Sequence, residues 1–178
     1  MLSKLTVFTY ESMARMTAES SFNLEEIGFG DKPIAVFLGL PDFDKSKHFM
    51  ATVFIRQLYF VLARKATDIK SGRCSRHVKF KLNEFGNMPS IEAMDSIITV
   101  CLGRNISFDL VVQSYSQITK LYGQEGADAI KENCGNHRYI LTKNGDTAQE
   151  ISGNLGNETI VDMQRSGEKL STHKHFME

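Results

Sequence analysis

Residues 78–89 read V-K-F-K-L-N-E-F-G-N-M-P, and this stretch decides the fold. Hydrophobic residues alternate with lysines from Val78 to Leu82, which is the pattern of a strand with one buried and one solvated face. A glycine and a proline then predict a sharp turn. Between strand and turn lie Asn83 and Glu84, an amide beside an acid. The segment predicts a strand that presents a polar pair at its carboxyl end.

Strands and helices alternate along the rest of the chain. Further strands are predicted over residues 34–40, 106–113, 139–142 and 159–163. Helices are predicted over residues 4–20, 46–66, 90–101, 114–122, 125–133 and 146–156. This alternation indicates βαβ units, so the expected class is α/β, with a mainly parallel sheet that carries helices on both faces.

Polar residues predict where several helices begin and end. Ser90 could cap the helix that follows it, and Asp146 with Gln149 resembles a capping box. Gly123 separates two short helices, and Gly156 marks the end of the last one.

Length and composition describe one ordinary globular domain. The 178 residues carry 21 Lys+Arg and 21 Asp+Glu, so the net charge is zero and the basic excess of a stand-alone nucleic-acid binder is missing. DNA contact through a local patch or an oligomer stays open. Three cysteines without framework spacing favour a reducing compartment. We expect a domain over residues 1–165, a loose polar tail over 166–178, and no signal peptide or membrane span.

The segment L-N-E-F-G-N-M-P at residues 82–89 resembles the L-D-E-F-G-N-x-P motif of the coupling ATPases of conjugative type IV secretion, the TraG-like DNA-transfer motors. Other motifs of that family occur in the same order and cover roughly residues 5–165. They are the stretches 32–42, 97–100, 103–106, 111–117, 121–123 and 133–136.

The resemblance implies a RecA-like P-loop fold and a hexamer anchored at the inner face of the cell membrane. Such motors use ATP and magnesium to pass DNA or protein to the secretion channel. The chain looks like the C-terminal part of that motor, a partial RecA-like domain without its P-loop strand. The expected location is cytoplasmic, at the membrane when membrane-anchored partners are bound. The implied partners are a full-length coupling ATPase or a separate P-loop half, the channel with its DNA-processing complex, and further copies of the chain.

The resemblance also implies roles for four residues. Glu84 would polarise the attacking water, and Asn83 occupies the place of the Asp that orients magnesium. Gln113 would sense the γ-phosphate, and Arg104 could act across a subunit boundary as an arginine finger. The residues by themselves also permit plainer interpretations: a surface acid, a hydrogen-bonded strand end and a solvated turn arginine.

Two departures from the family pattern bear on catalysis. No G-x-x-x-x-G-K-[ST] occurs, so the cradle and the lysine for the phosphates are missing. The amide of Asn83 keeps the shape of Asp but not its charge. We therefore expect no independent ATP hydrolysis and only weak binding of Mg-ATP. Without the P-loop strand, the sheet should also have an exposed edge that promotes oligomerisation.

Two C-x-x-H pairs raise the question of a zinc site. Cys74 with His77 and Cys134 with His137 could supply four ligands. One pair begins a strand and the other follows a helix, so nothing in the expected fold brings them together. No metal site is predicted.

Two functions remain. The first is a fragment of a conjugative coupling ATPase that is inactive alone. The second is a non-enzymatic module that docks on an intact coupling ATPase and modulates its hexamer. Turnover in a split motor requires Glu84 and Arg104, whereas a docking module tolerates their loss.

Overall fold

The computed structural model describes residues 18–19, 22–41, 43 and 48–156. In chain order the elements are α3 (Glu26–Phe29), α4 (His48–Thr67), β1 (Val78–Leu82), the 3-10 helix η3 (Phe85–Asn87), α5 (Met94–Val100), the 3-10 helix η4 (Cys101–Arg104), β2 (Ile106–Leu110), α6 (Tyr115–Glu132) and α7 (Gly145–Leu155). The fold is α/β, as expected. The predicted strand 159–163, the tail 166–178 and nearly all of the predicted helix 4–20 lie outside the described residues.

Strands β1 and β2 form a parallel pair, with Val78 opposite Ile106 and Leu82 opposite Leu110. Alternate β1 residues are buried, which confirms the strand predicted from the sequence. On the buried face, the rings of Phe80 and Phe108 stack with their centroids 4.7 Å apart. Hydrophobic burial on one face therefore sets the register of the pair.

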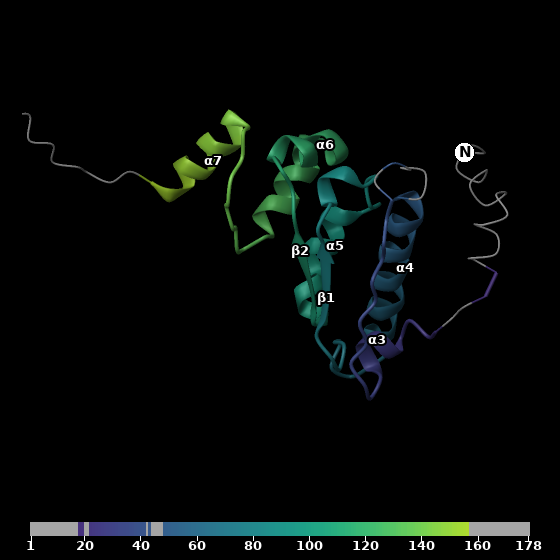
Figure 1. Ribbon diagram of the computed structural model, residues 1–178. Coiled ribbons are helices and arrows are strands. Elements are labelled where there is room, and N and C mark those ends of the chain that lie inside the picture. The colour runs from purple at the N-terminus through teal and green to yellow at the C-terminus, as the bar shows by residue number, and fades with distance from the viewer. Residues whose placement is uncertain (1–17, 20–21, 42, 44–47, 157–178) are drawn as a thin grey trace, which may run out of the picture.

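Helix α4 lies beside the sheet, and α5 and α6 lie near the carboxyl end of the strands (Figure 1). Tyr59 of α4 approaches Phe108 of β2, with a centroid distance of 6.4 Å. The same core contains Leu62 and Ile106, each with 0 % of its surface exposed. On the opposite face of the sheet, Lys79 of β1 pairs with Asp109 of β2 at 3.3 Å in partly exposed positions. The expectation of helices on both faces is thus wrong for these two strands, because their second face is polar and solvated.

Two predicted strands are absent from the described part of the chain. Residues 34–40 and 139–142 have no strand assignment, and most of their hydrophobic side chains are exposed. Phe37 is 92 % exposed and Ile140 is 94 % exposed. A strand requires a hydrogen-bonded neighbour as well as a suitable sequence. The described residues supply no such neighbour for either segment, so the sheet there has two strands.

The predicted helix boundaries need smaller corrections. Helix α5 begins at Met94, because Ala93 before it has a left-handed backbone with φ 59°. Helix α7 is capped by Asn144, whose Oδ1 accepts a hydrogen bond from the backbone N–H of Thr147 at 2.8 Å, and not by Asp146. The predicted break at Gly123 is confirmed, since its φ of 74° kinks α6.

Candidate functional site

The carboxyl ends of β1 and β2 bring Glu84 and Gln113 to the same edge of the sheet. Parallel strands end at a common edge, where α/β folds place their ligands. The backbone pairing continues past both strands: Val111 N–H donates to the Leu82 carbonyl at 3.0 Å, and Phe85 N–H donates to the Val111 carbonyl at 3.2 Å. The acid and the amide are therefore carried by a shared backbone framework.

Glu84 is held by the turn that follows β1. Its Oε2 accepts a hydrogen bond from Nδ2 of Asn87 at 2.5 Å, and Asn87 N–H donates to the Glu84 carbonyl at 2.9 Å. Phe85 anchors this turn, since it is 1 % exposed and its ring stacks on Tyr122 at 5.5 Å. The carboxylate of Glu84 is thus solvent-accessible but oriented. Asn83, beside it, is also exposed.

Gln113 is held through its backbone from two directions. Its N–H donates to Oε1 of Gln117 at 3.0 Å, and its carbonyl accepts from Oγ1 of Thr142 at 3.0 Å. Nε2 of Gln117 also reaches Oδ1 of Asn87 at 3.5 Å. Gln117 and Asn87 consequently connect the ends of the two strands, a connection that the sequence analysis did not identify. A polar residue one turn into the helix after β2 was the only signal for it.

Arg104 lies at the opposite edge of the sheet, just before β2. Its Nη1 donates to the Ala63 carbonyl at 2.9 Å and to Oγ1 of Thr67 at 3.0 Å, both in the last turn of α4. A five-residue strand separates it from the Glu84 edge, a length of roughly 16 Å. Arg104 is therefore not part of the same site within one chain. Its role toward a neighbouring subunit stays a prediction.

The residues at the Glu84 edge can hold only part of a magnesium–nucleotide complex. Magnesium prefers one or two carboxylates together with substrate phosphates. This edge offers the carboxylate of Glu84 and the amide of Asn83, and the sequence contains no phosphate-binding G-x-x-x-x-G-K-[ST] loop. The donor set could contact the magnesium ion of such a complex, and a phosphate loop would have to come from elsewhere. What it can do is orient a water molecule and accept its proton.

The two C-x-x-H pairs have other contacts. Nε2 of His77 lies 2.9 Å from Oγ of Ser107, and Nδ1 of His137 lies 2.9 Å from the Tyr115 hydroxyl. Burial raises the pKa of the Cys74 and Cys134 thiols, which disfavours the thiolate form that binds metals. Within the part of the chain that the structure describes, no group of three or more His, Cys, Asp or Glu side chains could hold a metal ion.

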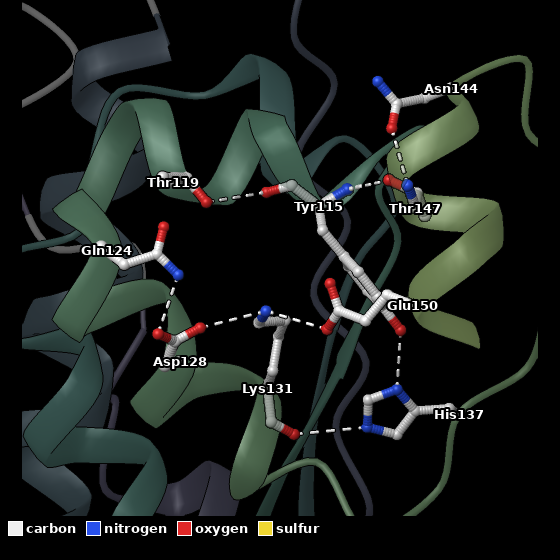
Figure 2. A network of polar contacts seen from close by, with 9 residues as sticks. All are labelled: Tyr115, Thr119, Gln124, Asp128, Lys131, His137, Asn144, Thr147 and Glu150. Carbon is white, nitrogen blue, oxygen red and sulfur yellow. Dashed lines mark hydrogen bonds and ion pairs between the residues drawn. The ribbon is translucent and has the colours of Figure 1, made fainter. Parts of the chain in front are cut away.

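A second polar network fastens α7 to α6 (Figure 2). Nζ of Lys131 contacts both Asp128 and Glu150 at 3.0 Å. Burial acts to lower the pKa of Lys131, but the hydrogen bonds that its Nζ donates to Glu150 and Asp128 outweigh this effect and raise the pKa. Tyr115 N–H donates to Oγ1 of Thr147 at 3.2 Å, which joins the starts of the two helices. This network places the segment that carries Thr142 beside the Gln113 strand end.

None of the helices among residues 48–156 or in the short described segments before them is long and apolar enough to cross a membrane.

Comparison with known proteins identifies the family. The family described as type IV secretory system conjugative DNA transfer matches residues 1–176. An uncharacterised protein of Bacillus anthracis is 48% identical over 65 residues, which is 36% of this chain and 24% of that protein. VirD4 of Agrobacterium fabrum is 32% identical over 90 residues, covering 50% of this chain and 14% of VirD4. VirD4 of Rhizobium radiobacter is 26% identical over 160 residues, covering 89% of this chain and 22% of VirD4.

The chain therefore spans a quarter or less of the length of these relatives. No solved structure matches it. Because the family match extends over almost all of its 178 residues, the chain belongs to the type IV secretory system family of conjugative DNA-transfer proteins.

Proposed function

We propose that this chain supplies the water-activating part of a split ATP-hydrolysing site in a conjugative coupling protein. The supporting observation is that Glu84 and Gln113 lie at one edge of the sheet and are connected through Asn87 and Gln117. The phosphate-binding loop comes from a polypeptide segment outside the 178 residues. By itself the chain is catalytically silent.

In this proposal each residue has one task. Glu84 orients a water molecule for attack on the γ-phosphorus and accepts its proton, while ADP leaves. Gln113 contacts the γ-phosphate with its side-chain amide. Asn83 contributes a neutral oxygen where a charged one would orient magnesium-bound water better, so hydrolysis is slow. Arg104 from a neighbouring subunit supplies positive charge to the transition state.

The open edge of β2 favours completion of the sheet by another polypeptide. In the described residues β2 pairs only with β1, so its other edge has unpaired backbone groups. In the resembling family the P-loop strand lies beside the sensor strand, which corresponds to β2. A separate P-loop half that pairs there would bring its phosphate loop to the Glu84 edge. Without such a partner, the unpaired side of β2 would promote association between copies of this chain.

The proposed setting is the inner face of the bacterial cell membrane, with membrane-anchored partners. There the completed assembly would act on DNA substrates at a type IV secretion channel. Direct DNA contact belongs in this proposal to the whole hexamer, since the chain has no net positive charge.

Reconstitution tests the proposal. The full chain is mixed with a separately expressed P-loop half of a related coupling protein, and phosphate release from ATP is measured. We expect no turnover from either part, turnover from the mixture, and its loss with Glu84→Gln. Tight, saturable Mg-ATP binding by the chain alone in calorimetry would contradict the proposed split of the site.

Exposed apolar segments favour a second candidate, a docking module without chemistry. Phe37 is 92 % exposed, and Ile140 and Leu141 are 94 % and 78 % exposed. Such residues are typical of binding surfaces. In this case the chain changes the ATPase rate of an intact coupling protein, and Glu84→Gln and Arg104→Lys leave that effect unchanged. Substitution of Phe37 by Ser would abolish it instead.

A further inference from the structure

A directional chain of hydrogen bonds runs from the backbone of Gln113 to the carboxylate of Glu84. Gln113 N–H donates to Oε1 of Gln117 at 3.0 Å, Nε2 of Gln117 donates to Oδ1 of Asn87 at 3.5 Å, and Nδ2 of Asn87 donates to Oε2 of Glu84 at 2.5 Å. Every donor in the chain points toward Glu84. Bonds aligned in this way polarise one another and end on the one group that carries charge.

Gly86 leaves the space through which the Gln117 side chain passes. A Cβ added at Gly86 would collide with Oε1 of Gln117 and would lie 2.8 Å from its Cδ. The backbone of Gly86 has no left-handed conformation that would by itself require glycine. The close approach of Gln117 is therefore the local reason for glycine at this position.

Capping of α6 explains only half of the Gln117 geometry. The N-cap residue Ser114 makes no side-chain cap bond. Instead, Gln117 in the first turn accepts a hydrogen bond from the N–H of Gln113, the residue before the N-cap. This accounts for the bond to Oε1. It does not account for the reach of Nε2 to Asn87, nor for the space above Gly86.

The Gln113 end of the chain is also held from the other side. Oγ1 of Thr142 donates to the Gln113 carbonyl at 3.0 Å. The peptide groups of Gln113 thus lie between Gln117 and Thr142. A displacement of this backbone must change the bond to Gln117, and the 3.5 Å contact between Gln117 and Asn87 is the weakest point of the chain.

We propose that Gln117 and Asn87 are positioning residues that make the orientation of Glu84 depend on the position of the Gln113 backbone. This inference rests on the proposed function, in which Gln113 contacts the γ-phosphate. When Gln113 moves toward a phosphate, the Gln117 amide follows, and Asn87 turns the Glu84 carboxylate. The acid is thereby set for water activation only while nucleotide is bound.

Two matched variants of the full chain separate capping from coupling. Gln117→Glu keeps an acceptor for Gln113 N–H but cannot donate to Asn87, whereas Gln117→Met removes both bonds. In NMR spectra we expect Gln117→Glu to shift the Asn87 side-chain amide while the hydrogen-exchange rate of Gln113 N–H stays as in the wild type. Gln117→Met and Gly86→Ala should shift the Asn87 resonance and also speed Gln113 exchange about tenfold. An unchanged Asn87 resonance in Gln117→Glu would overturn the inference.

A change at the Gln113 end of the hydrogen-bond chain tests whether its effect reaches Asn87. Thr142→Val makes this change, because it removes the hydrogen bond to the Gln113 carbonyl. We expect it to shift the Asn87 side-chain amide in the wild-type background but not in Gln117→Glu. Equal shifts in both backgrounds would mean that the two strand ends are not coupled through Gln117. Thr142→Ser, which retains the hydroxyl, is the control and should shift Asn87 in neither.

Turnover separates this inference from the proposed function. In the reconstituted mixture, Gln117→Glu should lower kcat about 10-fold to 100-fold and leave KM for ATP unchanged, because it misplaces the acid without removing a nucleotide contact. An unchanged kcat in an active mixture would exclude a positioning role. If the wild-type mixture has no turnover, the proposed function fails, while the NMR comparison still decides whether the strand ends are coupled.

Discussion

The two ends of the short sheet differ in what their polar side chains bind. At the amino end, Arg104 donates to the Ala63 carbonyl at 2.9 Å, and Nδ2 of Asn105 donates to the Cys74 carbonyl at 3.0 Å. At the carboxyl end, the side chains of Glu84, Asn87 and Gln117 bind one another. Bonds to the backbone of packed elements hold one arrangement, whereas bonds between exposed side chains can exchange at little cost. We therefore expect the amino end to contribute more to stability and the carboxyl end to adjust more easily.

Glu84→Gln should have the largest effect, and only on activity. Loss of the proton acceptor lowers kcat of the reconstituted mixture by roughly 100-fold to 10,000-fold. Because the carboxylate is exposed, the free energy of unfolding of the chain should change by less than about 0.5 kcal/mol. Phosphate-release assays and urea denaturation measure the two quantities. A large loss of stability would remove the distinction between the two ends.

Truncation of one apolar residue at each end sharpens the comparison. Ile106, at the amino end of β2, has 0 % exposure, whereas Leu110 at the carboxyl end is half-buried. Ile106→Ala should lower the free energy of unfolding by about 3 kcal/mol. Leu110→Ala should lower it by roughly 1 kcal/mol, because less surface returns to water. Chemical denaturation of both variants measures the difference, and similar losses would count against the contrast.

Alkaline pH should weaken the turn behind Glu84. Burial, opposed by the hydrogen bond from Ile91 N–H, raises the pKa of Tyr122 to about 12. Since this folded-state pKa exceeds the unfolded value near 10, the contribution is fully present below about pH 10 and is lost as the pH rises through about 12. Between about pH 9 and pH 11.5 the wild type should lose roughly 2 kcal/mol more than Tyr122→Phe. Urea denaturation at the two pH values decides this, and parallel losses would refute it.

Arg104→Lys should have the smallest effect. Lysine keeps the charge and has enough donors, but its side chain ends one bond earlier than Nη1, which donates to Ala63 and Thr67, so these bonds should be lost or weakened. The free energy of unfolding should fall by about 1 kcal/mol. Thermal unfolding of the isolated chain measures this part. A loss of turnover in the mixture with unchanged stability would instead indicate that Arg104 acts mainly across a subunit boundary.

Much of the central fold could be predicted from local patterns. Alternating residues predicted β1 because one face of that strand is buried, and the helix predicted over residues 46–66 corresponds to α4. Gly123 predicted the kink in α6, since few other residues adopt its backbone conformation. The strands expected over residues 34–40 and 139–142 were wrong. Their apolar sequences suit strands, but a strand also needs a neighbour, which sequence periodicity cannot supply.

In the candidate site, too, the sequence determined some features and the tertiary structure determined others. The order of motifs around L-N-E-F-G-N-M-P determined the family, the acid at the end of β1 and the polar end of β2. Tertiary structure decided that Arg104 lies at the far edge, and that Gln117 and Asn87 join Glu84 to Gln113. Local sequence determines which residues end a strand. Only the parallel pairing and the packing of α6 over Gly86 determine which of those residues meet.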